Sequence, residues 1–133
     1  MKLGTMFSGG GLFDIGAMQA GVTPAWAVEY DPAVADVYRR NVGDHIIVAD
    51  VDDVRFDKLT DQFGEIDWLH ASPSCKHASR GNPDWGETAD DLRSASAVVT
   101  AIRTLRPYFF TLENVWPYRN FKSFINIRNA VAG

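Results

Sequence analysis

Short apolar runs alternate with segments of helical periodicity along this chain, and the alternation restricts the folds that it can adopt. The runs predict β-strands at residues 2–8, 24–30, 45–51, 65–71 and 108–115. The segments between them predict helices at residues 12–21, 31–41 and 91–107, with a helical tail from about residue 117. Strand and helix repeated in this order favour an α/β fold, with a mostly parallel sheet and helices on both faces.

Polar and glycine residues gather where the predicted strands end. Ligands of such sheets bind beyond the carboxyl ends of the strands. All the candidate functional residues fall there: Ser8 to Gly11, Glu29, Asp50, Ser72 to Cys75, and Glu113 to Val115. We therefore expect one site, at one edge of the sheet.

Composition describes a single globular domain. The chain has 133 residues, 46% of them apolar, and a single cysteine. No apolar run reaches the roughly 20 residues that span a bilayer, the N-terminus has no signal-peptide pattern, and one cysteine cannot form an internal disulfide, so we expect a cytoplasmic protein without a membrane partner. Residues 1–70 carry 12 acids and 5 bases, whereas residues 71–133 carry 5 acids and 8 bases. A polyanion would meet the second half more readily.

The stretch "FSGGGLFDIG" places three glycines between the first predicted strand and its helix. Glycine lets the backbone turn sharply and lets a ligand lie against amides at a helix N-terminus. Glu29 follows Gly9 by 20 residues, where an acid commonly binds a ribose diol, and Asp50 could accept from an adenine amino group. The pattern indicates a nucleoside pocket. The plainer alternative is a tight turn and two solvated strand ends.

A dinucleotide site fits this turn less well. The G-x-G-x-x-G pattern needs glycine at position 14, where Asp14 stands. An acid beside the turn disfavours a pyrophosphate, whereas the cationic sulfonium of S-adenosylmethionine tolerates it. This argues against a nucleotide-dependent oxidoreductase.

The single thiol lies in "ASPSCKHAS", at the start of a polar segment. A lone cysteine is most often a small buried hydrophobe. Cys75, however, stands beside Lys76 and near His77, where positive charge favours thiolate. A zinc site with His70 and His77 lacks a fourth ligand and has unusual spacing, so we expect no metal.

Five motifs together carry one resemblance. "MFSGGGLFDIGAMQAG", "VEYDP", "ADV", "ASPSCKHAS" and "LENV", in this order from Leu3 to Val115, resemble the cytosine-C5 DNA methyltransferases. The resemblance implies a Rossmann-like fold that binds S-adenosylmethionine, with double-stranded DNA as substrate and a role in DNA methylation or restriction-modification. It also implies transfer of a methyl group to carbon 5 of a flipped cytosine through a covalent cysteine adduct.

The resemblance also implies a role for each matching residue. Cys75 would attack carbon 6 of cytosine and Glu113 would exchange a proton with ring nitrogen N3. Glu113 could instead be a strand-end acid paired with Arg119. The expected DNA and base contacts are Lys76, Ser79 and Asn114. The expected cofactor contacts are Phe7, Gly9, Gly11, Leu12, Glu29, Tyr30, Asp50, Val51 and Pro73.

The chain departs from the family pattern in three ways. Leu12 replaces a glycine of the turn, and Ser74 and Lys76 replace a proline and a glutamine around the thiol. Nothing after Val115 resembles the family's Gln-x-Arg-x-Arg strand, target-recognition region or final helix. We therefore expect residues 1–133 to be a partial, apparently truncated catalytic domain, of bacterial or phage-like origin, that lacks the recognition region. A complementing carboxyl-terminal chain is the implied partner, and a non-catalytic remnant that binds S-adenosylmethionine or DNA is the alternative.

Overall fold

A computed structural model describes residues 1–74, 78 and 85–133. The described strands are β1 (Lys2–Met6), β2 (Thr23–Glu29), β3 (Ile46–Val48), β4 (Trp68–Ala71) and β5 (Phe109–Leu112). The described α-helices are α1 (Leu12–Gln19), α2 (Pro32–Asn41), α3 (Phe56–Phe63), α4 (Ala89–Leu105) and α5 (Lys122–Ala132). Two short 3₁₀ helices, η1 (Val51–Asp53) and η2 (Trp116–Asn120), follow β3 and β5.

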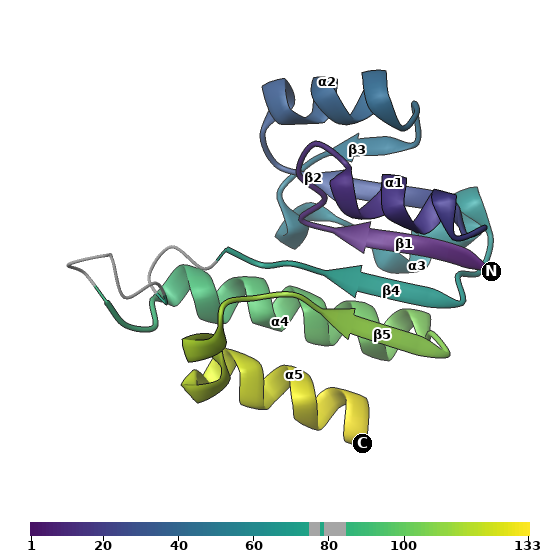
Figure 1. Cartoon of the computed structure of the whole chain (residues 1–133). Coiled ribbons are helices and arrows are strands. Elements are labelled where there is room, and N and C mark those ends of the chain that lie inside the picture. Colours follow the sequence, from purple (N-terminus) through teal and green to yellow (C-terminus); the bar gives the residue numbers. More distant parts are fainter. Residues whose placement is uncertain (75–77, 79–84) are drawn as a thin grey trace.

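The described strands form one parallel sheet in the order β3-β2-β1-β4-β5 (Figure 1). β1 lies at the centre and pairs with β2 on one side and β4 on the other. From β1 the chain adds β2 and β3 on one side and then returns to add β4 and β5 on the other. Doubly wound sheets bind ligands at this switch point, beside β1. The predicted α/β class and parallel sheet are confirmed.

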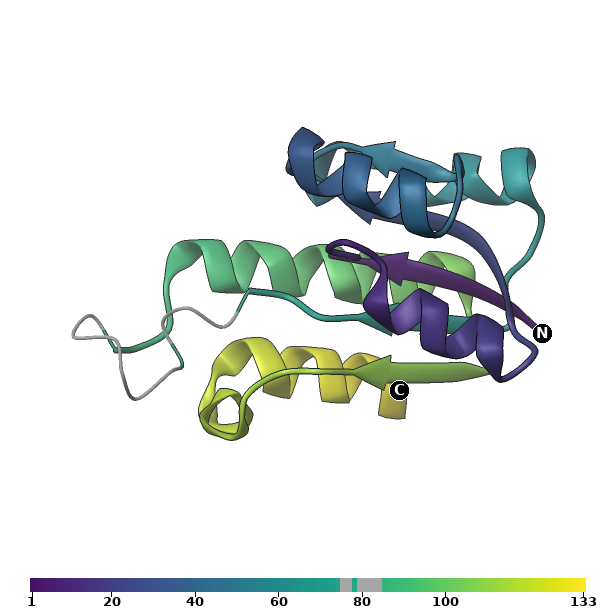
Figure 2. The same ribbon diagram turned by 45° about the horizontal axis from the view of Figure 1, so that its top comes forward.

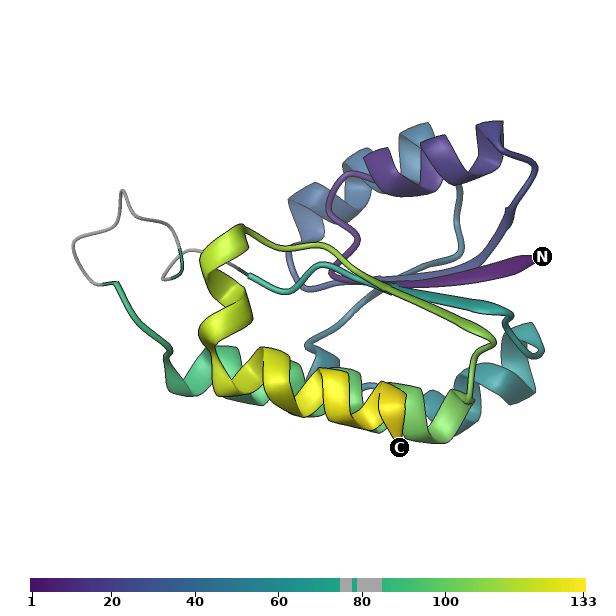
Figure 3. The ribbon, with the colours of Figure 1, turned by 60° about the horizontal axis from the view of Figure 1, so that its bottom comes forward.

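Helices cover both faces of the sheet. Figure 3 shows α1 and α2 on one face and α3, α4 and α5 on the other, with α4 and α5 side by side. Figure 2 shows α2 and β3 towards one edge of the sheet and β5 with α5 towards the other. A sheet covered on both faces needs apolar strands throughout, which explains why the strands read as apolar runs.

The larger part of the core lies between the sheet and the helices α3, α4 and α5. Its largest side chain, Trp26 of β2, is fully buried. The ring lies over Gly4 of the neighbouring strand, where an added Cβ would come within 2.4 Å of the Trp26 Cζ2 atom. Gly4 is therefore required by a close approach within the core.

The helix α3 was missing from the sequence prediction, which placed no element between residues 51 and 65. Phe56, Leu59 and Phe63 recur at helical spacing on this helix, and the first two are buried against the core. Gly64, with a φ of 82°, follows the last turn. The periodic signal was present, but it extends over only eight residues and is interrupted by charged side chains. No helix in the described ranges has the length and apolarity to cross a membrane.

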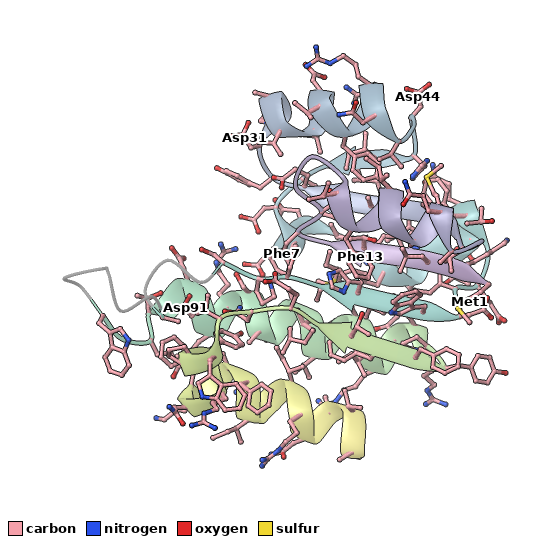
Figure 4. All side chains as sticks on the ribbon, in the orientation of Figure 1. Met1, Phe7, Phe13, Asp31, Asp44 and Asp91 are labelled. Atoms are coloured by element: carbon pink, nitrogen blue, oxygen red, sulfur yellow. The ribbon has the colours of Figure 1, made fainter. Side chains whose placement is uncertain are left out.

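His70 of β4 is a buried titratable group. It is 3% exposed, its ring stacks on Phe13 with 3.5 Å between centroids, and its Nδ1 lies 2.8 Å from the Thr111 hydroxyl. Figure 4 shows Phe13 on α1. Burial lowers the pKa of His70 to about 4 from its usual 6.5. The side chain is therefore neutral at pH 7.

This depressed pKa predicts a pH-dependent stability. Between pH 6.5 and pH 4 the unfolded chain binds more protons than the folded one, so the free energy of unfolding falls as the pH falls through that window. Above pH 6.5 the contribution is constant. We expect a loss of about 2 kcal/mol between pH 7.5 and pH 5, measured by urea denaturation. A His70→Gln variant should lose correspondingly less, and an equal loss in both proteins would refute the assignment.

Candidate functional site

The carboxyl ends of the strands meet at one side of the molecule. Figure 4 shows Phe7, Asp31 and Asp91 towards this side, and Met1 and Asp44 towards the other. Phe7 directly follows β1 with a φ of 58°, and Gly9 and Gly11 also have positive φ values. These left-handed residues turn the chain from β1 into α1.

Glu29, at the end of β2, holds the glycine turn to the start of α2. Its Oε1 accepts from the Gly9 amide at 3.1 Å, and its Oε2 accepts from the Asp31 amide at 2.8 Å. Asp31 in turn caps α2 by accepting from the Ala33 amide at 2.8 Å. Each carboxylate oxygen can accept more than one hydrogen bond, so Glu29 can still receive a ligand hydroxyl.

The helix α2 packs directly onto the turn at Gly11. A Cβ on Gly11 would come within 2.5 Å of Val42 Cγ2 and 2.9 Å of Tyr38 Cδ2, and the φ of 93° is unfavourable for other residues. Glycine is required here both by the close approach and by the backbone conformation. Leu12, which directly follows Gly11, is 84% exposed and begins α1.

Asp14 does not face the ligand side of this turn. It is fully buried, accepts from Thr5 Oγ1 at 2.7 Å, and accepts from the Tyr38 hydroxyl, which is also 2.8 Å from His45 Nε2. Burial raises the pKa of Asp14, although these hydrogen bonds oppose the shift. The expectation that Asp14 would repel a pyrophosphate is therefore wrong, because its carboxyl group points into the protein and fixes α1 against β1 and α2.

A cavity of about 350 Å³ opens beside these strand ends. Five of the predicted cofactor residues line it: Phe7, Glu29, Tyr30, Asp50 and Val51. The lining also contains Ser74, which the sequence analysis placed among the strand-end candidates, and four residues that it missed: Val28, Asp90, Arg93 and Ser94. Four other predicted cofactor residues do not line the cavity, although each lies within a few residues of one that does: Gly9, Gly11, Leu12 and Pro73.

Among the described residues that line this cavity, Arg93 of α4 is the cation. Its Nη1 lies 2.8 Å from Asp50 Oδ1 and 2.6 Å from Asp52 Oδ2. The pKa of Asp50 is held below its usual value, first by the Asp52 amide that donates to it and then by Arg93. The sequence signal for Arg93 was weak, because an arginine near the start of a helix is common on protein surfaces.

The ends of β4 and β5 are tied together beside this cavity. The Asn114 side-chain amide donates to the Pro73 carbonyl at 3.0 Å, and the Glu113 backbone amide donates to the Ala71 carbonyl at 3.0 Å. Ser72 Oγ donates to the Phe7 carbonyl at 3.0 Å and so joins β4 to β1. Predicted residues Cys75, Lys76 and Ser79 lie outside the described residues, as does His77.

The arrangement suits a ligand that is rich in hydrogen-bond donors. Glu29 and Asp50 offer acceptors, while the cation Arg93 is already engaged by two carboxylates. Among the described lining residues, a phosphate would face three carboxylates and one cation. Within residues 1–74 and 85–133, no group of three or more His, Cys, Asp or Glu side chains is placed to hold a metal ion.

The sequence is similar to a known protein family and to curated proteins. The family model described as C-5 cytosine-specific DNA methylase matches residues 1–127. The Type II methyltransferase M1.HphI of Haemophilus parahaemolyticus is 30% identical over 115 residues, which cover 83% of this chain and 31% of that protein. The Type II methyltransferase M.AquIA of Picosynechococcus sp. is 31% identical over 121 residues, which cover 86% of this chain and 48% of that protein. The chain thus spans about a third to about a half of the length of the curated relatives that it matches.

Solved structures share the fold at lower identity. The Dnmt2 methyltransferase of S. pombe superposes with a TM-score of 0.77 at 20% identity, over 99% of this chain and 41% of that one. The methyltransferase EhMeth of Entamoeba histolytica superposes with a TM-score of 0.71 at 16% identity, over 99% of this chain and 43% of that one. At these identities the likeness supports the fold.

The double role of Glu29 predicts a measurable effect on stability. In Glu29→Ala the amides of Gly9 and Asp31 lose their acceptor, so we expect the free energy of unfolding to fall by about 1–2 kcal/mol. Urea denaturation measures this. The exposed Glu65 provides a matched control, because Glu65→Ala should change stability by less than about 0.5 kcal/mol. Equal effects of the two substitutions would contradict the role given to Glu29.

Proposed function

The chain belongs to the C-5 cytosine-specific DNA methylase family, and from this premise we propose that it is the part of a DNA cytosine-C5 methyltransferase that binds the cofactor and carries the nucleophile. The methyl donor of this family is S-adenosylmethionine. The hydrogen bond from Asn114 to Pro73 is the observation that carries the proposal, because it aligns the two strand ends that lead to Cys75 and Glu113.

The cavity has the size and chemistry of a nucleoside site. Its volume of about 350 Å³ lies within the usual range for small-molecule pockets. Glu29 would accept from the ribose hydroxyls and Asp50 from the adenine amino group. Phe7, Tyr30 and Val51 supply apolar and aromatic surface for the purine and ribose. The lining acids also suit a cationic ligand, and S-adenosylmethionine supplies an electrophilic methyl group on a sulfonium centre.

The register of the sheet supports convergence of the nucleophile and the acid. Ala71 of β4 pairs with Leu112 of β5, so the residues that follow, Ser72 and Glu113, leave neighbouring parallel strands at the same level. Cys75 follows Ser72 by three residues, and its neighbour Ser74 lines the cavity. This register supports the proposal that Cys75 and Glu113 act on one pyrimidine ring beside the cofactor.

Cys75 acts as the nucleophile in this proposal. Carbon 5 of cytosine is too weakly nucleophilic to accept a methyl group unaided. Addition of the Cys75 thiolate to carbon 6 forms a carbon–sulfur bond and moves the ring electrons towards carbon 5 and N3. After methylation, loss of the proton on carbon 5 restores the double bond and expels the thiolate.

Glu113 acts as the general acid and base at ring nitrogen N3 in this proposal. As the thiolate adds, a protonated Glu113 carboxyl donates to N3 and prevents negative charge from accumulating on the ring. The proton returns to Glu113 when the thiolate leaves. Glu113 is exposed at the end of β5, where a ring could contact it.

The target base must leave the duplex to reach both groups. Lys76 and Ser79 belong to the segment that would meet the DNA, with Lys76 suited to a phosphate. Both polar groups of the Asn114 side chain are used within the chain, by Pro73 and by the Val115 amide at 2.9 Å. We propose that Asn114 positions the nucleophile segment in addition to any contact with the base.

A second candidate function is that of one component of a two-chain enzyme. The matched relatives are two to three times as long as the region they share with this chain. The side chains of Phe109 and Trp116, on and after the edge strand β5, are 55% and 72% exposed. Such large exposed apolar side chains beside a sheet edge favour a partner there, and a chain with a target-recognition region is the partner that the family implies.

Covalent trapping tests the proposed chemistry. Duplex DNA that contains 5-fluorocytosine cannot lose a proton from carbon 5, so the adduct should persist in the presence of S-adenosylmethionine. We expect a covalent complex, seen by denaturing electrophoresis, that is absent in Cys75→Ala. An adduct that appears only with a co-expressed recognition chain would establish the two-component form. No adduct under either condition would reject catalysis and leave a binding role.

The role of Glu113 has a separate kinetic signature. In Glu113→Gln the side chain can no longer give up and regain a proton, so adduct formation should slow by about 10²–10⁴-fold while cofactor binding stays unchanged. Single-turnover trapping and calorimetric titration with S-adenosylhomocysteine measure the two quantities. A loss of cofactor binding equal to the loss of rate would show that Glu113 is needed for structure instead.

A further inference from the structure

Arg93 sits among four acids around the cavity. From the first turns of α4 it contacts Asp50 and Asp52, and its Nε lies 3.5 Å from Asp90 Oδ1. Glu29 lines the same cavity from the end of β2. The motifs that identified the family do not include this arginine, and the proposed chemistry does not use it.

We propose that Arg93 is a positioning residue that orients the Asp50 carboxylate as an acceptor for an exocyclic amino group, and so makes the cavity selective for an aminopurine nucleoside. The inference rests on the proposed function, because it takes Asp50 as the adenine contact. The preference of Asp50 for an amino group would then depend on Arg93, which lies on α4 and is 43 residues away in the sequence.

The contacts of Asp50 favour one free oxygen. In the described part of the chain, Oδ1 receives both the Asp52 amide at 3.1 Å and Arg93 Nη1 at 2.8 Å. These two donors fix the carboxylate plane and leave Oδ2 for a ligand. Charged hydrogen bonds of this kind are stronger and more directional than neutral ones.

Arg93 also controls the charge of this acid. Without it Asp50 would face Asp52 on η1, Asp90 on α4 and Glu29 on β2, and repulsion between like charges would favour its protonated form. The Asp52 amide and Arg93 lower the pKa of Asp50, so it stays an ionised acceptor further into the acid range. Protonation would remove its preference for a donor.

Selectivity for the amino group follows from this chemistry. An ionised carboxylate can only accept hydrogen bonds. A purine with a 6-amino group donates to the free Oδ2 of Asp50, whereas a purine with hydrogen at that position leaves Oδ2 facing the ligand without a donor. The energetic difference should be visible as a ratio of two affinities.

Calorimetry with two ligands tests the inference. S-adenosylhomocysteine is compared with its analogue whose purine lacks the 6-amino group. We expect the wild-type chain to bind the analogue about tenfold or more weakly, because it loses a hydrogen bond to a charged group. In Arg93→Gln this ratio should fall to about threefold or less. Arg93→Lys, which keeps the positive charge but lacks the planar guanidinium with its several N–H donors, should give an intermediate ratio.

Two controls separate positioning from a general loss of structure. Arg103→Gln changes another exposed arginine of α4 and should leave the ratio at its wild-type value. Asp52→Asn removes the charge of one partner of Arg93 but leaves the bond from Arg93 to Asp50, so the ratio should also persist. Thermal unfolding shows whether Arg93→Gln is folded. If it is not, the ratio measured for Arg93→Lys tests the positioning role, and an intermediate value is expected.

The pH dependence of binding provides an independent readout. Arg93→Gln should raise the pKa of Asp50, so affinity for S-adenosylhomocysteine should begin to fall at a higher pH on acidification than in the wild type. If the wild-type chain binds the ligand and Arg93→Gln keeps the full ratio and the same pH profile, this inference is overturned and the proposed function stands. If the wild-type chain binds neither ligand, both are overturned.

Discussion

Parallel hydrogen bonding of β1 to a strand on each side is the interaction on which the site depends. Because β2 and β4 both run in the same direction as β1, their carboxyl ends reach one edge of the sheet together with it. β3 and β5 extend the same arrangement outwards. The ends of five strands thus meet at this edge, although they are far apart in the sequence. The short, mostly apolar strands are stable only because helices cover both faces.

Side-chain to main-chain hydrogen bonds then fix the positions of the strand ends. Glu29 joins the glycine turn to α2, Ser72 joins β4 to β1, and Asn114 joins β5 to the segment after β4. Loop backbone that lacked such partners would have to hydrogen-bond to water and would be free to move. Glu29, which lines the cavity, therefore also holds part of its wall in place.

Two aspartates show how burial decides the role of an acid. Asp14 is enclosed by Thr5 and Tyr38, and its raised pKa reflects its separation from water. Asp50 lies at a cavity beside Arg93, and its lowered pKa reflects donors that stabilise its charge. Both follow a strand or turn near the predicted site, and nothing in the sequence distinguishes the buried acid from the one beside the cavity.

The order of apolar runs and glycine turns in the sequence determined the parallel α/β fold, the edge of the sheet that holds the site, and five residues of the cavity, because strand direction alone brings strand ends together. Tertiary structure decided what depends on side-chain direction. It turned Asp14 inwards, brought Arg93 from α4 onto Asp50 across 43 residues, and engaged Asn114 with Pro73. Sequence spacing cannot predict these contacts, because they depend on how helices rotate as they pack against the sheet.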